Sequence, residues 1–284
     1  MGWIYSGRFK FFISALLISA CATADQKCRG VYFSNRYYDI DILKDGLNKI
    51  HQITLNRNDN TLYFTFDQIA RVPTRVLGYL DISTRTSGLV EGIRNATCIA
   101  IDQAYNKVYV GGSEGIFRIN SYKVPERIPV QDNIQSMYFK DVLFYTNSRN
   151  EAYMYDSGHI NPVFELQGVA AEKIILDDDH NIFFTQGKTL FRVKIGTRVV
   201  NSHERYRTNI LTTDFDDKPY ISTNDGVYVY NKYKYVFDKV SDITGLKALT
   251  FNKAGEPIYS VVDLIVHLKY NPVRCIESVI YNRN

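Results

Sequence analysis

Short apolar strands alternate with polar turns along most of the chain. The recurring unit is an apolar strand, a turn rich in Asp, Asn and Lys, a second strand with a central aromatic residue, another turn and a third strand. The central aromatic residues are Tyr63, Tyr109, Phe144, Phe183, Tyr220 and Tyr259, at spacings of 46, 35, 39, 37 and 39. The alternating residues are Tyr, Phe, Val, Ile and Thr, and helical signals are nearly absent. The pattern therefore predicts an all-β chain.

Repetition of this unit predicts a six-bladed β-propeller, because propeller blades are four-stranded units of about 40 residues. A stacked β-sandwich or two small barrels are the alternatives, and the six matched units favour the propeller. Residues 30–43 hold two strand-like runs before the first full unit. We expect one N-terminal strand to close the ring by pairing with the C-terminal strands in a shared blade, so that residues 25–284 form a single domain.

The first 24 residues predict a secretory signal peptide. Arg8 and Lys10 precede the apolar run 11–20, and small residues precede a cleavage site before Asp25. The apolar run is too short to span a hydrocarbon core about 30 Å thick. We therefore expect the mature protein to be secreted and extracellular.

Three cysteines remain after cleavage. Cys28 and Cys275 lie near the two chain ends and are predicted to form a disulfide across the ring closure. Cys98 lies in an apolar strand and is expected to be a buried free thiol. Cys21 offers a competing interpretation of the N-terminal segment, as the lipidated residue of a bacterial lipoprotein. Asn95, in an Asn-Ala-Thr motif, is a predicted glycosylation site.

Charge excludes several classes of partner. Removal of residues 1–24 leaves 260 residues and lowers the formal net charge from +4 to +2, because Arg8 and Lys10 are lost. A nearly neutral chain lacks the basic stripe that a nucleic-acid binder needs, and it lacks the polybasic segment of a membrane-surface protein. We expect a monomer with no nucleic-acid or membrane partner and no cofactor.

No catalytic arrangement stands out. The chain has no Gly-x-Ser-x-Gly elbow, and its histidines lie in different units, with His267 expected on a strand surface. The acidic clusters 177–179 and 214–217 lie between first and second strands, where Asp caps solvated turns. A calcium-dependent propeller lactonase or esterase is kept as the alternative function, because it would need acidic and amide ligands that converge on the channel. A propeller that binds other proteins is a weaker third possibility.

Long polar and cationic residues precede the first strands of the units, where propeller loops surround one mouth of the channel. The candidate ligand-binding residues are His51, Arg94, Gln135, Lys173, Arg207 and Lys247. Cations with aromatic residues nearby suit a flat, anionic, aromatic ligand. The competing interpretation is that each is an ordinary solvated loop residue.

Four segments resemble the insect ommochrome-binding proteins. These segments are residues 28–31, 60–64, 108–116 and 218–227, and the resemblance runs over most of residues 25–270. It implies a secreted lepidopteran haemolymph protein, not an enzyme, that carries or sequesters ommochromes, the phenoxazinone pigments derived from tryptophan. No family motif assigns ligand residues. An ommochrome is flat, aromatic and carboxylated, which agrees with the site expected at the channel mouth.

Overall fold

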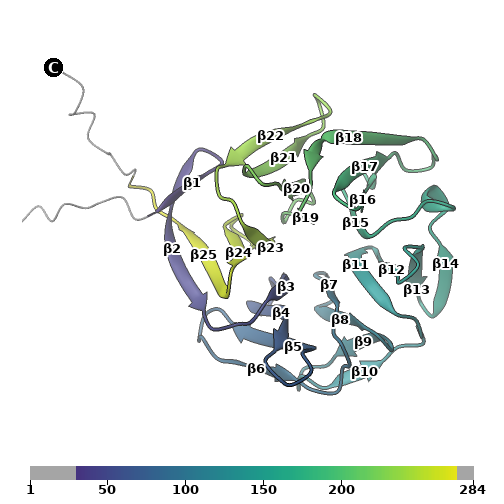
Figure 1. Cartoon of the computed structure of the whole chain (residues 1–284), viewed down its shortest axis with the longest axis horizontal. Coiled ribbons are helices and arrows are strands. Elements are labelled where there is room, and N and C mark those ends of the chain that lie inside the picture. Colours follow the sequence, from purple (N-terminus) through teal and green to yellow (C-terminus); the bar gives the residue numbers. More distant parts are fainter. Residues whose placement is uncertain (1–29, 274–284) are drawn as a thin grey trace, which may run out of the picture. The chain divides into compact units, whose positions relative to one another are not determined.

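The computed structural model describes residues 30–273, which form six antiparallel β-sheets arranged as blades around a central axis (Figure 1). The predicted all-β, six-bladed propeller is confirmed. The short 3₁₀ helix η1 (Phe164–Leu166) is the one helical element in this range, and no helix there is long and apolar enough to cross a membrane. The predicted signal peptide and the predicted Cys28–Cys275 disulfide lie outside the described residues.

Five blades contain four strands each, and in every one of them the strands lie in chain order from the axis outwards (Figure 1). Blade 1 is built from β3 (Ile50–Asn56), β4 (Thr61–Gln68), β5 (Thr74–Asp81) and β6 (Ser87–Val90). Blade 2 is built from β7 (Cys98–Asp102), β8 (Lys107–Gly112), β9 (Gly115–Ile119) and β10 (Pro125–Arg127). Blade 3 is built from β11 (Ile134–Lys140), β12 (Val142–Asn147), β13 (Ala152–Asp156) and β14 (His159–Pro162). Blade 4 is built from β15 (Lys173–Leu176), β16 (Ile182–Gln186), β17 (Thr189–Val193) and β18 (Val200–Arg207). Blade 5 is built from β19 (Ile210–Thr213), β20 (Pro219–Ser222), β21 (Val227–Asn231) and β22 (Val236–Ser241).

Blade 6 closes the ring with strands from both ends of the described chain. It contains β23 (Leu246–Phe251), β24 (Pro257–Val261), β25 (Leu264–Tyr270), β2 (Arg36–Lys44) and β1 (Val31–Phe33). β2 pairs with β25 through registers such as Tyr38 with Tyr270 and Ile40 with Leu268. The predicted shared blade is confirmed, but two N-terminal strands join it instead of one, because the turn after Phe33 folds β1 back onto β2.

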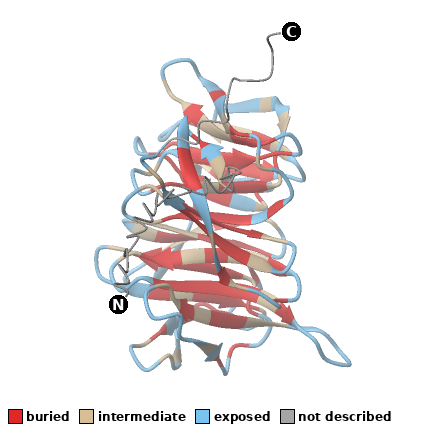
Figure 2. Ribbon diagram, turned by 90° about the vertical axis from the view of Figure 1, so that its left-hand side faces the viewer, coloured by how far each residue is buried: buried red, intermediate tan, exposed pale blue. Residues whose placement is uncertain are grey.

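Hydrophobic side chains fill the spaces between neighbouring blades. Each of the six core clusters combines residues from two adjacent blades. Between blades 1 and 2, for example, Tyr63 and Leu77 pack with Ile99 and Val110. Figure 2 shows the same distribution, with buried residues along the strands and exposed residues in the turns. Full burial of one such side chain stabilises the fold by about 1.5–3 kcal/mol. The aromatic residue repeated in each blade therefore stabilises the contact between neighbouring blades.

The acidic residues after the first strands cap their turns, as expected. Asp177 Oδ1 accepts hydrogen bonds from the backbone N–H groups of Asp179 and Asn181. Asp214 Oδ1 accepts them from Asp216 and Lys218. The prediction that these carboxylates are solvated is wrong for Asp177 and Asp214, which are buried, because the turn that each one caps also encloses it.

Candidate functional site

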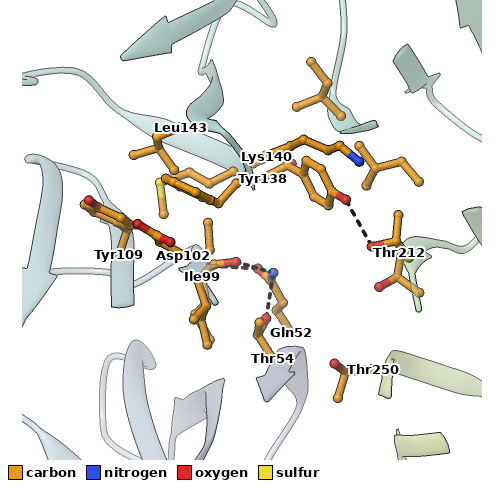
Figure 3. Close-up of a pocket in the computed structure, with 18 of the residues that line it drawn as sticks. Gln52, Thr54, Ile99, Asp102, Tyr109, Tyr138, Lys140, Leu143, Thr212 and Thr250 are labelled. Carbon is orange, nitrogen blue, oxygen red and sulfur yellow. Dashed lines mark hydrogen bonds between the residues drawn. The ribbon is translucent and has the colours of Figure 1, made fainter. Parts of the chain in front are cut away.

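A cavity of about 1050 Å³ lies at the centre of the ring (Figure 3). Its wall is formed by the six innermost strands β3, β7, β11, β15, β19 and β23, and by the turns that follow several of them. Apart from Arg75 of β5, the lining residues on other strands belong to blades 2 and 3. The cavity therefore extends from the axis into the groove between these two blades.

Four of the six predicted ligand-binding residues line this cavity: His51, Gln135, Lys173 and Lys247. Each lies at or next to the start of an innermost strand, so the four surround the same mouth. Lys173 Nζ donates a hydrogen bond to the Asn209 carbonyl oxygen (3.3 Å). The ammonium group has surface open to the cavity, but protein crowds it on most sides, and this desolvation lowers the pKa of Lys173.

The other two predicted residues, Arg94 and Arg207, do not line the cavity. Arg94 is exposed and its guanidinium faces Glu114, with Nη1 3.9 Å from Oε1. Arg207 is the last residue of β18, the outermost strand of blade 4, and is also exposed. Arg207 therefore lies on the outer edge of blade 4 and not in a loop above the channel, although only Thr208 and Asn209 separate it from β19.

His51 belongs to a cluster of charges around Asp67. Its Nε2 lies 2.8 Å from Asp67 Oδ1, while Arg75 Nε and Lys49 Nζ each lie 3.5 Å from the same carboxylate. Burial lowers the pKa of His51, although the hydrogen bond with Asp67 opposes this shift. Burial alone would raise the pKa of Asp67, but the His51 hydrogen bond and the nearby cations outweigh it and lower that pKa. Two fixed cations around one carboxylate leave this mouth positively charged.

Gln52, which also points to the axis, has a structural partner. Its Nε2 donates to the Ile99 carbonyl oxygen (2.9 Å) and its Oε1 accepts from the Ile99 N–H (3.0 Å) (Figure 3). Gln103 makes the reciprocal pair from blade 2, donating to the Leu55 carbonyl oxygen (2.8 Å) and accepting from the Arg57 N–H (3.0 Å). These amides tie blades 1 and 2 together at the channel wall.

Polar groups cross the cavity at the end where the innermost strands finish. The Tyr138 hydroxyl lies 3.1 Å from the Leu176 carbonyl oxygen, 3.2 Å from the Thr213 hydroxyl and 3.1 Å from Asp217 Oδ1. Lys140 Nζ donates to Asp217 Oδ2 (2.6 Å). Burial, together with the Asp217 charge, raises the pKa of Tyr138, so the phenol stays neutral. Blades 3 and 5 are thus joined across the axis.

Aromatic side chains form the wall of the groove between blades 2 and 3. The rings of Tyr109 and Phe139 are stacked, with centroids 6.0 Å apart and an angle of 6° between their planes. Tyr155 lines the same groove, and all three rings are half-buried. Burial raises the pKa of Tyr109, which keeps its hydroxyl protonated. The groove therefore offers neutral, flat surfaces beside the charged cavity.

The acidic residues of the cavity do not fit a calcium site. Within residues 30–273 no three His, Cys, Asp or Glu side chains gather closely enough to hold a metal ion. The carboxylates that line the cavity are Asp102, Asp141, Asp156 and Asp217. Each has a partner elsewhere: two backbone N–H groups for Asp102, His180 for Asp141, Ser157 for Asp156 and Lys140 for Asp217. They do not converge as the ligands of a hydrolase metal would.

Solved structures share this architecture. The chain superposes on a gluconolactonase from Xanthomonas campestris with a TM-score of 0.64 and 10% sequence identity, covering 85% of this chain and 92% of that one. It superposes on an auxiliary nutrient-binding protein from Bacteroides thetaiotaomicron with a TM-score of 0.60 and 10% identity, covering 85% and 76%. At such low identity these similarities support the propeller fold alone.

Sequence comparison gives a more specific relationship. No protein-family model matches the chain. The ommochrome-binding protein of Manduca sexta is 26% identical over 246 residues, which cover 84% of this chain and 90% of that protein. A match over nearly the full length of both chains agrees with the motifs that resemble this family. The expected resemblance to the insect ommochrome-binding proteins is thus confirmed, as a similarity to the Manduca sexta protein that runs over most of the chain.

Proposed function

We propose that the protein is a secreted carrier that binds an ommochrome pigment in its central cavity. The observation that carries this proposal is the combination, in one cavity, of cations at a mouth and flat aromatic walls in the adjoining groove. The volume of about 1050 Å³ suits a polycyclic ligand, since small-molecule sites measure roughly 300–1,000 Å³. The name of the Manduca sexta relative supports the choice of pigment.

In this proposal the cavity contacts two kinds of surface on the ligand. Lys173 and Lys247 attract acidic groups at the mouth, with Gln135 offering an amide and Arg75 adding positive charge. His51 contributes less directly, because its hydrogen bond with Asp67 already uses Nε2. The rings of Tyr109, Phe139 and Tyr155 cover a face of the pigment by stacking.

Substitution of the two lysines tests the proposal. We expect Lys173→Ala and Lys247→Ala each to weaken pigment binding about tenfold or more, because a desolvated charged hydrogen bond contributes roughly 1.5–3 kcal/mol. Arg94→Ala and Arg207→Ala are matched controls, since they remove a cation outside the cavity. Binding is measured by the absorbance band that the purified protein retains after dialysis, and by titration at low and high salt. Binding should weaken in high salt. If both lysine variants bind as tightly as the controls do, the ligand lies elsewhere.

Binding without catalysis is the function that the residues support best. A lactonase would need metal ligands that converge on the channel, and the cavity carboxylates are engaged by other groups. Lactone hydrolysis assayed with and without calcium decides between the two functions. Calcium-dependent turnover by a colourless protein would contradict the carrier.

We further propose that the protein circulates in haemolymph as a monomer glycosylated at Asn95. Asn95 is exposed, and its φ of 52° places it at a tight turn in front of β7, where a glycan can project into solvent. An Asn95→Gln variant secreted from insect cells should lose the mass that a glycosidase removes from the parent. Size-exclusion chromatography with light scattering measures the oligomeric state.

A further inference from the structure

The guanidinium group of Arg57 faces the central cavity without a partner in the described protein. Arg57 follows β3, and its backbone N–H is held by Gln103 Oε1 (3.0 Å). Its side chain lines the cavity and its Nε is buried without a hydrogen-bond partner. Within residues 30–273 the rest of the guanidinium likewise has no hydrogen bond or ion pair to a side chain or carbonyl group.

An arginine in this position is costly for the protein. A guanidinium carries five N–H donors in a planar fork and keeps its charge in proteins. Asp217 is the acidic group with the strongest influence on it, but Lys140 and Tyr138 already bind both Asp217 oxygens. Burial lowers the pKa of Arg57 even though Asp217 opposes the shift. The fold therefore holds a partly buried cation that its own acidic residues do not neutralise.

We propose that Arg57 anchors a planar carboxylate of the bound ligand, at the end of the cavity opposite Lys173 and Lys247. The inference rests on the proposed binding function and deepens it by placing one acidic group of the ligand. A carboxylate matches the planar fork with two parallel hydrogen bonds. A phosphate dianion fits less well, because Lys140, the neighbouring cation, is already paired with Asp217. The aromatic groove adjoins this end, since Phe139 lies next to the last residue of β11.

The first experiment compares an ommochrome with its methyl ester on matched variants. In the parent we expect the free acid to bind about tenfold or more tightly than the ester. Arg57→Met removes the charge but keeps an unbranched side chain, so it should lose most of the preference for the acid, and Lys173 and Lys247 at the other end of the cavity account for what remains. Arg57→Lys keeps the charge without the fork and should recover only part of the preference for the acid. Arg94→Met and Arg207→Met, outside the cavity, should keep the parent's preference.

The second experiment measures thermal unfolding without ligand. Removal of an unsatisfied cation should raise the Tm of Arg57→Met by roughly 2–5 °C, whereas a structural arginine would lower it. A lower Tm, or an unchanged preference of Arg57→Met for the acid, overturns the inference even if the parent binds pigment. If the parent binds neither pigment form, the proposed pigment function fails and the role of Arg57 as its anchor fails with it, while a higher Tm of Arg57→Met would still show that the arginine is an unsatisfied cation.

Discussion

Two glutamine side chains replace main-chain pairing where blades 1 and 2 meet. Gln52 satisfies both the N–H and the carbonyl group of Ile99, a residue that is almost fully buried. Loss of the amide leaves these backbone groups without partners, which costs about 1–3 kcal/mol for a buried donor or acceptor. We therefore expect Gln52→Ala to lower the free energy of unfolding by about that amount in urea titrations. Gln135→Ala is the control, because this exposed glutamine bonds only to the nearby Asn133 side chain. An equal loss in both variants would contradict the inter-blade role.

His267 predicts a pH dependence of stability. It was expected on a strand surface, but it is buried in β25, with Nε2 3.0 Å from Glu256 Oε2, because β2 covers it on the other side. Burial lowers its pKa below 6.5, although Glu256 opposes the shift. As pH falls through 6.5, the unfolded chain therefore binds a proton that the folded chain does not, and stability decreases.

Unfolding free energies between pH 7 and pH 5 check this expectation. His267→Gln should show a shallower decrease than the parent, with the remaining slope coming from His51 and His203, whose pKa values burial also lowers. Glu256 does not titrate between pH 7 and pH 5. Burial alone would raise its pKa, but hydrogen bonds from Tyr270 and Asn252 outweigh this effect and lower the pKa below 4.5, so its contribution to stability is lost only in stronger acid. A parallel profile for His267→Gln would refute the assignment.

At the scale of single elements, glycine opens the third strand of two blades. Gly115, at the start of β9, has a φ of 126°, and Gly226, just before β21, has a φ of 148°. A Cβ atom would lie 2.1 Å from the Val130 carbonyl oxygen at Gly115 and 2.3 Å from the Ser241 carbonyl oxygen at Gly226. Each carbonyl oxygen belongs to the outer edge of the same blade as its glycine, so it cannot move away from an added Cβ atom without breaking that edge.

Alanine at these two glycines should therefore be strongly destabilising. We expect Gly115→Ala and Gly226→Ala each to cost about 3 kcal/mol or more, since both steric overlap and an unfavourable φ act on the new side chain. Gly187→Ala is a matched control with a φ of 57° and no atom near its Cβ position, so it should cost about 1 kcal/mol. Chemical denaturation compares the three variants. A loss at Gly115 or Gly226 no greater than that at Gly187 would show that the blade edge yields.

Strands could be predicted from sequence far better than the cavity lining. Each second strand has an aromatic residue that packs between blades, and the alternation of apolar and polar residues along the strand predicts this burial directly. Arg207 was misplaced because a strand boundary two residues from β19 decides whether its side chain belongs to the channel or to the outer edge. Arg57 was missed because nothing local distinguishes it: a charged residue also follows the capping residue in the turns that contain Asp178 and Lys253. Only the ring arrangement places its side chain on the axis.

For the whole molecule, the closing blade supports the predicted Cys28–Cys275 disulfide. Val31 pairs with Tyr38, and Tyr38 pairs with Tyr270, so both ends of the described chain leave blade 6 on the same side. We expect non-reducing peptide mapping to find Cys28 joined to Cys275, and the Cys28→Ser, Cys275→Ser double variant to lose about 4–5 kcal/mol by the chain-entropy model. Cys98 should remain a thiol, because burial raises its pKa to about 12. A bridge that contains Cys98 would contradict the assignment.

The pairing of β2 with β25 also sets an order of events during synthesis. The ribosome makes β1 and β2 before any other strand of the propeller, yet their partner β25 begins about 220 residues later. At roughly 5–20 residues per second, these first strands wait on the order of ten to forty seconds for it. During that interval Tyr38 and its neighbours present an unpaired edge that can associate with other chains. A nascent chain truncated before Leu264 keeps that edge open, so we infer that the last strand protects the first from aggregation.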